Sequence, residues 1–240
     1  MQIAILLYDR FTALDAVGPF QTLNPLPGAE VVFVAEKAGP VLDDTGSLTV
    51  VAQKSLAEVT RPDIVVVPGG PAPDVENEAV LDWLRTVDAT TTWTTSVCTG
   101  SLLLAAAGLL NGRRATSHWL FLDHLKEFGV DPTGQRVVFD GKYVTAAGVS
   151  SGIDMGLTLA GRIAGDEHAQ AVQLMIEYDP RPPYDAGSPE KAPAALVEMF
   201  RANGVPDQGG SAASRAGSAY GEGAGARGSA AAAGGADHQA

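Results

Sequence analysis

The sequence has a single cysteine, few aromatic residues and no long hydrophobic run. One cysteine in 240 residues, Cys98, excludes an internal disulfide, so nothing points to an oxidising compartment. The apolar segments 1–7 and 102–110 are too short to cross a membrane, and segment 1–7 lacks the basic residues of a signal peptide. We therefore expect a soluble, cytoplasmic protein.

Positive charge is also scarce. The chain carries 16 Lys and Arg against 28 Asp and Glu, for a net charge of −12. An acidic surface repels phosphate backbones, so we expect no nucleic-acid partner. A P-loop, a G-x-G-x-x-G motif and a Cys/His cluster with metal-ligand spacing are all missing from the sequence. The sequence therefore predicts no cofactor and no metal.

The composition divides the chain into two parts. With 45% hydrophobic residues, the chain can form one domain of about 200 residues with a real core. Composition changes near the end, where 25 of the 34 residues from Asp207 onward are Gly, Ala or Ser. Such a segment buries too little apolar surface to offset the entropy of ordering it. The sequence predicts a folded domain over 1–204 and a disordered tail over 205–240.

Short apolar runs alternate with segments of helical periodicity. Strands are expected at 2–7, 30–35, 63–67 and 90–97, with an edge strand at 48–52 after a turn-rich loop at 40–47. A short strand between a turn and a loop is expected within 112–119, and a hairpin of 136–139 with 142–147. Helices are expected at 13–23, 76–87, 102–110, 120–128, 153–164, 167–178 and 192–203. Strands that alternate with helices predict an α/β fold, with a mostly parallel central sheet and helices on both faces.

Cys98 lies where a predicted strand turns into a predicted helix. A helix N-terminus favours negative charge, so we expect the thiol there to have a lowered pKa and to be held as a thiolate. A free cysteine also packs as a small hydrophobic residue, so a buried structural role is the alternative. The turn makes Cys98 a candidate nucleophile.

Three further candidates follow predicted strands, and the carboxyl ends of parallel strands meet at one edge of a sheet. Asp15 is either a helix-end acid or a catalytic carboxyl. Gly69 and Gly70 form either a simple turn or a site where bare N–H groups bind an anion. His118 is either a capping or core residue or the partner of a thiolate.

A second motif, Gly148-Val149-Ser150-Ser151-Gly152, matches the G-x-S-x-G elbow of serine hydrolases. In that fold the acid and then the histidine follow the serine. Downstream only His168 lies within the domain, and it falls inside a predicted helix. We interpret the match as chance, and its glycines as allowing the chain to pass close to Cys98.

Four segments together resemble the DJ-1/PfpI superfamily. They are Asp15–Pro19, Val65–Gly70, Ser96–Gly100 and Arg114–Trp119. The resemblance covers roughly residues 1–180 and implies a flavodoxin-like α/β sandwich that forms a homodimer, with its site near the interface. It also implies that Cys98 is a nucleophile on a strained elbow.

Within the superfamily, a cysteine followed by Thr99, with Asp15 in place of a glutamate, resembles the isocyanide hydratases. That resemblance implies a small-molecule isocyanide substrate, proton transfer by Asp15, orientation of substrate or water by Thr99, and N–H groups of Gly70 and Thr99 around the site. PfpI-type proteases carry histidine at the position of Thr99, which counts against proteolysis. The alternatives are a glyoxalase- or deglycase-like enzyme and a non-catalytic cysteine sensor or regulator. AraC-type regulators share the Cys-Thr-Gly signature and carry a C-terminal helix-turn-helix domain. Here that place holds a short predicted helix and a Gly/Ala/Ser-rich tail, which argues against a regulator.

Overall fold

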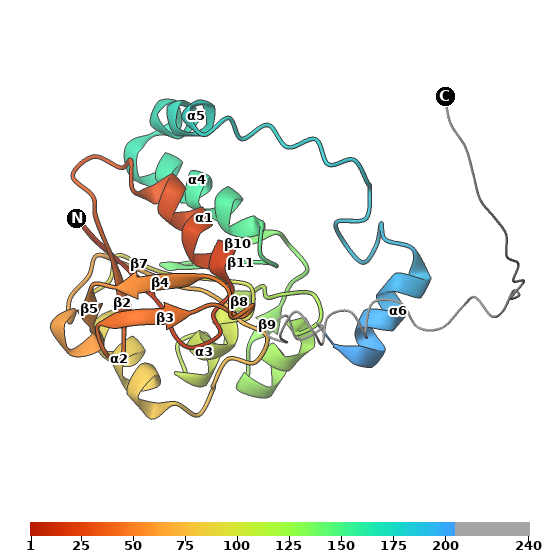
Figure 1. The fold of residues 1–240 in the computed structure, drawn as a ribbon, viewed down its shortest axis with the longest axis horizontal. Helices are drawn as coiled ribbons and strands as arrows, with labels where there is room; N and C mark the ends of the chain where they lie inside the picture. The colour runs from red at the N-terminus through yellow and green to blue at the C-terminus, as the bar shows by residue number, and fades with distance from the viewer. Residues whose placement is uncertain (205–240) are drawn as a thin grey trace, which may run out of the picture. The chain divides into compact units, whose positions relative to one another are not determined.

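A computed structural model describes residues 1–204, and its centre is a seven-stranded sheet (Figure 1). The strand order is β10-β11-β7-β6-β1-β2-β5, and every neighbouring pair is parallel except β10 with β11. The strands are β1 (Gln2–Leu6), β2 (Glu30–Ala35), β5 (Lys54–Ser55), β6 (Ile64–Val67), β7 (Trp93–Val97), β10 (Val137–Asp140) and β11 (Tyr143–Ala146). The mostly parallel sheet predicted from the sequence is confirmed.

Helices cover both faces of this sheet (Figure 1). One face carries α1 (Ala13–Leu23) and α4 (Ser151–Ala164), and the other carries α2 (Glu78–Asp88) and α3 (Gly100–Ala106). The remaining helical elements are η1 (Leu56–Glu58), η2 (Leu122–Phe128), α5 (Asp166–Met175) and α6 (Ala194–Asn203). This is the predicted α/β layering. No helix in residues 1–204 is long and apolar enough to span a membrane.

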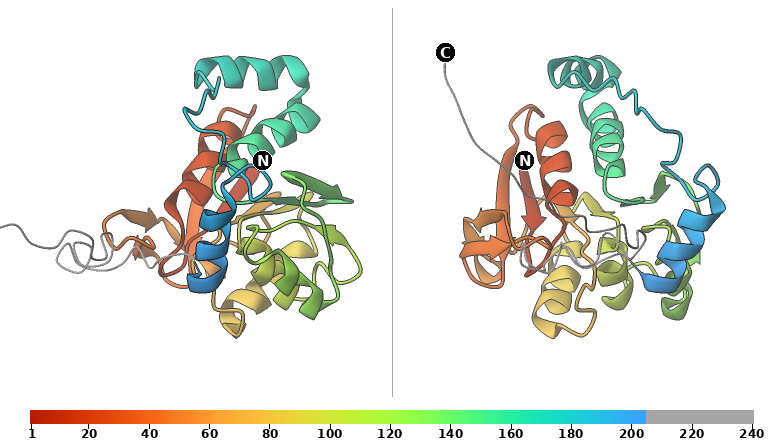
Figure 2. Two further views of the ribbon diagram at one scale, coloured as in Figure 1. Left: turned by 90° about the vertical axis from the view of Figure 1, so that its right-hand side faces the viewer. Right: turned by 45° about the vertical axis from the view of Figure 1, so that its right-hand side comes forward.

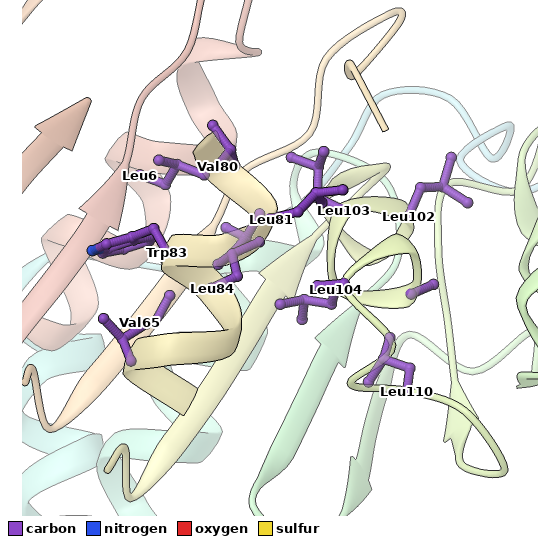
Figure 3. Close-up of a cluster of buried hydrophobic side chains, with 14 of the residues drawn as sticks. Leu6, Val65, Val80, Leu81, Trp83, Leu84, Leu102, Leu103, Leu104 and Leu110 are labelled. Atoms are coloured by element: carbon purple, nitrogen blue, oxygen red, sulfur yellow. The ribbon is translucent and has the colours of Figure 1, made fainter. Parts of the chain in front are cut away.

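The apolar strands have a core on each side, because successive side chains of a strand point to opposite faces. In β1, Ala4 and Leu6 belong to the cluster under α2 and α3, whereas Ile3 and Ile5 belong to the cluster under α1 and α4. Figure 3 shows the first cluster, in which leucines of α2 and α3 gather over the sheet. Burial on both faces explains why these strands are continuous apolar runs rather than alternating ones.

The segment between β2 and β5 differs from the prediction. The expected loop at 40–47 begins with a strand, β3 (Gly39–Leu42), which pairs antiparallel with β4 (Thr49–Ala52) in a separate two-stranded sheet. The Asp43 carboxylate accepts the N–H groups of Ser47 and Leu48 and so holds the turn of this hairpin. The polar turn was therefore predicted, but the strand before it was missed.

Three other predictions are corrected in detail. The helix expected at 102–110 begins earlier and ends at Ala106, and the helix expected at 120–128 is a 3-10 segment. The short strand expected within 112–119 is β8 (Arg114–Ala115), but its parallel partner β9 (Asp131–Pro132) was not foreseen. The predicted tail, 205–240, lies outside the described residues, so its boundary stays a prediction.

Helices α1 and α4 pack closely because glycines lie between them. A Cβ atom on Gly156 of α4 would lie only 1.9 Å from Thr22 Oγ1 of α1, and one on Gly18 of α1 would lie 3.1 Å from Ile153 Cγ1. Asp15 lies in the first turn of α1, and α4 begins one residue after Ser150. The close packing therefore sets the distance between the two segments that flank Cys98.

We expect Gly156→Ala to lower the free energy of unfolding by about 1–3 kcal/mol, because the added methyl group overpacks the contact with Thr22. Gly161→Ala is the matched control on the same helix, since its Cβ would meet no atom closer than 3.3 Å. Alanine is the better helix former, so the control should be as stable as the wild type or more so. Urea unfolding measures both variants, and equal stabilities would contradict the packing argument.

Candidate active site

Cys98 occupies the turn between β7 and α3 in a backbone conformation that few side chains adopt. Its φ is 58°, in the left-handed region, and its side chain is buried. The backbone N–H of Cys98 donates to the carbonyls of Ala146 and Ala147 at 3.0 and 2.9 Å. Its carbonyl accepts the hydroxyls of Ser101 and Ser117, both at 3.1 Å. Contacts on both sides hold this strained turn in place.

Asp15 faces the cysteine from the first turn of α1. Its side chain is 0% exposed, and Oδ2 accepts the N–H of Gly69 at 2.9 Å. Oδ1 is buried and has no hydrogen-bond partner in the described part of the chain. Burial raises the pKa of Asp15 to about 7, although the Gly69 N–H and the Cys98 thiol both act to lower it. At neutral pH this carboxyl therefore can both take and give a proton.

The Cys98 thiol does not have the lowered pKa expected from the sequence. Burial raises its pKa, and the negative charge of Asp15 raises it further. The N–H groups of Val149 and Thr99 and the Thr99 hydroxyl favour the thiolate but do not outweigh burial. The resting form is a thiol beside an acid that titrates near neutrality.

The two glycines after β6 hold the site's side chains rather than a ligand. The N–H of Gly69 is bonded to Asp15, and the N–H of Gly70 donates to Thr99 Oγ1 at 2.9 Å. The Thr99 hydroxyl in turn donates to the Gly70 carbonyl at 2.6 Å. The prediction that Gly70 offers a free N–H to the site is therefore wrong. Glycine is needed at 69 because a Cβ there would lie 2.6 Å from the backbone nitrogen of Thr99.

Val149 is a residue of the site that the sequence analysis did not predict. Its N–H faces the Cys98 sulfur, and its φ of 24° is unusual for a β-branched residue. Val149 belongs to the G-x-S-x-G match. Ser150 Oγ there accepts from Arg136 at 3.2 Å, and the buried Ser151 Oγ has no partner among residues 1–204. Neither serine is paired with a histidine, which agrees with a chance match.

His118 lies on the wall of a pocket and not on the sulfur. Its ring lies tilted against those of Trp119 and Phe121, with centroids 5.9 and 6.1 Å apart, and Nδ1 accepts the N–H of Leu120 at 3.4 Å. Burial lowers its pKa, which favours the neutral imidazole. Within residues 1–204 no hydrogen bond joins it to Cys98. The structure therefore brings Asp15, Cys98, Thr99, Gly69 and Gly70 together and leaves His118 at the edge.

A pocket of about 610 Å³ opens beside this cluster. Ser117 and Val149, which both contact Cys98, line it together with His118 and Trp119. Among residues 1–204 there is no group of three or more His, Cys, Asp or Glu side chains that could hold a metal ion. The chemistry offered by the described residues is a nucleophilic thiol with an adjacent proton carrier, next to a space for a small molecule.

A cysteine in a strained turn, between a strand of a parallel sheet and a helix, defines a class of protein. Comparison with known proteins identifies that class. The chain belongs to the DJ-1/PfpI family, whose family model matches residues 1–161. A ThiJ/PfpI family protein from Pseudomonas syringae has a solved structure with a TM-score of 0.82 and 38% identity, covering 86% of this chain and 87% of that one.

More particular relatives are enzymes of known name. Isonitrile hydratase of Pseudomonas putida is 43% identical over 208 residues, which are 86% of this chain and 91% of that protein. A deglycase of Pyrococcus abyssi is 31% identical over 150 residues, which are 61% of this chain and 89% of that protein. The superfamily resemblance drawn from the four sequence segments is confirmed.

The raised pKa of Asp15 makes a prediction about stability. A carboxyl whose pKa is higher in the folded state stabilises the fold below its unfolded pKa, near 4, and that contribution is lost as the pH rises through about 7. Asp15→Asn cannot ionise, so its unfolding free energy relative to the wild type should grow between pH 4.5 and 8. The gain should be on the order of 3 kcal/mol. Urea unfolding at several pH values measures it, and a difference that does not change with pH would contradict the burial argument.

Proposed function

We propose that this protein is an isonitrile hydratase, an enzyme that adds water to an isocyanide, R–N≡C, to give the formamide R–NH–CHO. The observation that carries the proposal is the buried Cys98 thiol beside a carboxyl with a pKa of about 7. The identity with an isonitrile hydratase over most of both chains supports it. The reaction needs a nucleophile, a proton carrier and water, and the described residues supply the first two.

In the first step the Cys98 sulfur attacks the terminal carbon of the isocyanide while Asp15, as carboxylate, takes the thiol proton. The new S–C bond leaves a pair of electrons on that carbon. Asp15 then gives the proton to the carbon, and the product is a thioimidate, R–N=CH–S–Cys98. Because the proton moves from sulfur to carbon through one carboxyl, Asp15 ends the step ionised, as it began.

In the second step water adds to the thioimidate carbon. Asp15 takes a proton from the water as its oxygen bonds to carbon and then gives that proton to the nitrogen, which yields R–NH–CH(OH)–S–Cys98 and leaves Asp15 ionised. The C–S bond then breaks, the hydroxyl becomes the formyl carbonyl, and the proton returns to the sulfur. One water is consumed and the thiol is restored, so no cofactor takes part.

The groups around the sulfur suit these steps. The N–H groups of Val149 and Thr99 favour negative charge on sulfur and so assist both its attack and its departure. The Thr99 hydroxyl donates to the Gly70 carbonyl and accepts the Gly70 N–H, so its role is to hold the loop after β6 rather than to orient water or substrate. His118 lines the pocket and takes no proton-transfer role.

Assembly and location are part of the proposal. We propose a cytoplasmic homodimer with a small-molecule substrate and no nucleic-acid or membrane partner. The single cysteine supports the cytoplasmic location, and the net charge of −12 supports the absence of a nucleic-acid partner. The homodimer is what the family resemblance implies.

A substrate panel tests the proposed function. Wild-type protein should convert cyclohexyl isocyanide to N-cyclohexylformamide and should leave methylglyoxal unchanged. Turnover of methylglyoxal alone would instead support a glyoxalase- or deglycase-like enzyme. Turnover of neither, with ready oxidation of Cys98 by peroxide, would support a cysteine sensor.

We expect Cys98→Ser and Cys98→Ala to abolish hydration, because the covalent step needs the thiol. Asp15→Asn should lower kcat by about 10² to 10⁴, the usual range for a lost acid–base catalyst. Steady-state kinetics measure all three variants, and circular dichroism checks that each is folded. A Cys98→Ala variant with wild-type kcat would rule out the covalent mechanism.

The pH dependence should follow Asp15. Attack requires the carboxylate, so kcat/KM should rise as the pH increases through about 7, the pKa of Asp15 in this site. Asp15 and Cys98 titrate as a coupled pair, so the apparent pKa of the kcat/KM profile belongs to both groups together. The rise near pH 7 should vanish in the residual activity of Asp15→Asn. A rise that persists in this variant would assign the proton transfer to another group.

A further inference from the structure

The pocket beside Cys98 has a wall that comes from outside the family core. The family model ends at residue 161, yet Gly187–Glu190 and Arg201 line the pocket. We call residues 162–204 the C-terminal extension. Figure 2 shows its last helix, α6, beside the η2 region of the core. Phe200 of α6 meets the Trp119 ring edge-on, with centroids 6.5 Å apart and planes at 85°.

The extension separates two kinds of relative. The 208 residues aligned with isonitrile hydratase must reach well beyond residue 161. The 150 residues aligned with the deglycase already make up 89% of that protein, so little of it remains to form a counterpart. The alignment with the isonitrile hydratase therefore includes the extension that forms this wall, whereas the shorter deglycase has little chain left for a counterpart.

Two residues that line the pocket under the extension also contact Cys98, which itself lies behind the pocket wall. Ser117 donates to the Cys98 carbonyl at 3.1 Å, the N–H of Val149 faces the sulfur, and both residues line the pocket. A larger cavity, of about 690 Å³, lies where β1 and β2 end. Tyr8 lines that cavity and lies near enough to Asp15 and Cys98 that burial and then both groups raise the pKa of its phenol. The N–H that faces the sulfur, however, is that of Val149, which lines the pocket under the extension. The isocyanide carbon must reach the sulfur while the protein binds the R group. The pocket under the extension is therefore the one that binds the R group.

The lining of this pocket is suited to an uncharged group. Its wall includes Trp119, Leu122, Val149 and Pro189, and burial favours the neutral form of His118. Three charged side chains on the wall have an opposite charge as partner. These pairs are Arg136–Asp154, Arg201–Glu198 and Asp123–Lys126. The fourth, Glu190, accepts a hydrogen bond from Ser188. Glu190 keeps its negative charge, but its side chain is exposed to solvent, so it does not require a charged ligand.

We propose that the C-terminal extension completes the binding site for the R group of the isocyanide, and that this site selects an uncharged, ring-bearing R group packed against Trp119. The proposal rests on the proposed function for the identity of the reacting group. A volume of about 610 Å³ falls in the range of pockets that enclose whole small molecules, about 300–1,000 Å³. Phe200 positions the Trp119 ring, so α6 acts on specificity through that contact.

Alkylation of Cys98 tests the pocket without relying on hydratase activity. Because the chain has one cysteine, mass spectrometry of the intact full-length protein reports reaction at Cys98 alone. The two probes are iodoacetamide and N-benzyl-iodoacetamide, which form the same S–C bond and release iodide. We expect the wild type to react faster with the benzyl probe, after correction for their rates with free cysteine.

Two variants and a control locate the effect. The corrected benzyl-to-iodoacetamide rate ratio should fall about tenfold or more in Trp119→Ala and several-fold in Phe200→Ala, in line with the loss of a hydrophobic subsite. Met199→Ala is the control, because Met199 lies beside Phe200 on α6 but is 45% exposed and does not line the pocket. The ratio should not change in this control. Melting temperatures show whether each variant is folded, and Trp119→Phe should keep most of the preference if Trp119→Ala unfolds.

The experiment tests the R-group site and the proposed hydratase function separately. Equal corrected rates for the two probes in the wild type, no reaction with either probe, or an unchanged ratio in Trp119→Ala and Phe200→Ala would each overturn the R-group site. If the ratio behaves as expected but cyclohexyl isocyanide is not hydrated, the pocket stands and the proposed function fails. If isocyanides are hydrated, the ratio of kcat/KM for cyclohexyl over methyl isocyanide should fall with the same variants.

Discussion

The site depends on the burial of Asp15 against Cys98. Two acidic groups that face each other away from water cannot both ionise cheaply, so burial raises the pKa of each and the pair holds a proton near neutrality. That proton is what a hydration of R–N≡C must move from sulfur to carbon. The Gly69 N–H bonds one carboxyl oxygen of Asp15 and so fixes the carboxyl beside the sulfur, while the other oxygen is buried without a hydrogen-bond partner in residues 1–204. The fold positions Asp15 with α1 and the sulfur with the β7 turn, and close helix packing through Gly156 holds these elements in place.

Much of the fold follows from sequence patterns with a simple physical cause. Runs such as Ile64–Val67 are buried on both faces, so they are wholly apolar and their strands were predicted correctly. Strand β3 was missed because Gly39 and Pro40 usually indicate a turn, whereas here they begin a short exposed hairpin held by Asp43. The last turn of the predicted helix at 102–110 was wrong because α3 ends before Gly108, whose φ of 82° a helix does not allow.

The candidate site was predicted by residue type but not by electrostatics. Asp15, Gly69 and Cys98 follow strands, so their convergence could be foreseen from the topology alone. The direction of the thiol pKa could not, because it depends on burial, which only the packed structure gives. The same holds for the N–H groups. Those of Gly69 and Gly70 are used inside the protein, and the Val149 N–H came from a motif whose meaning depends on where α4 begins.

The measurement that tests the central claim most directly is a titration of thiolate absorbance near 240 nm, with Cys98→Ser as the blank. The account predicts no full thiolate step in the wild type near pH 7, because the proton lost there comes from Asp15. It also predicts that Asp15→Asn lowers the pKa of the thiol, since the negative charge that opposes the thiolate is removed. A full thiolate step at or below pH 7 in the wild type, unchanged in Asp15→Asn, would contradict the account.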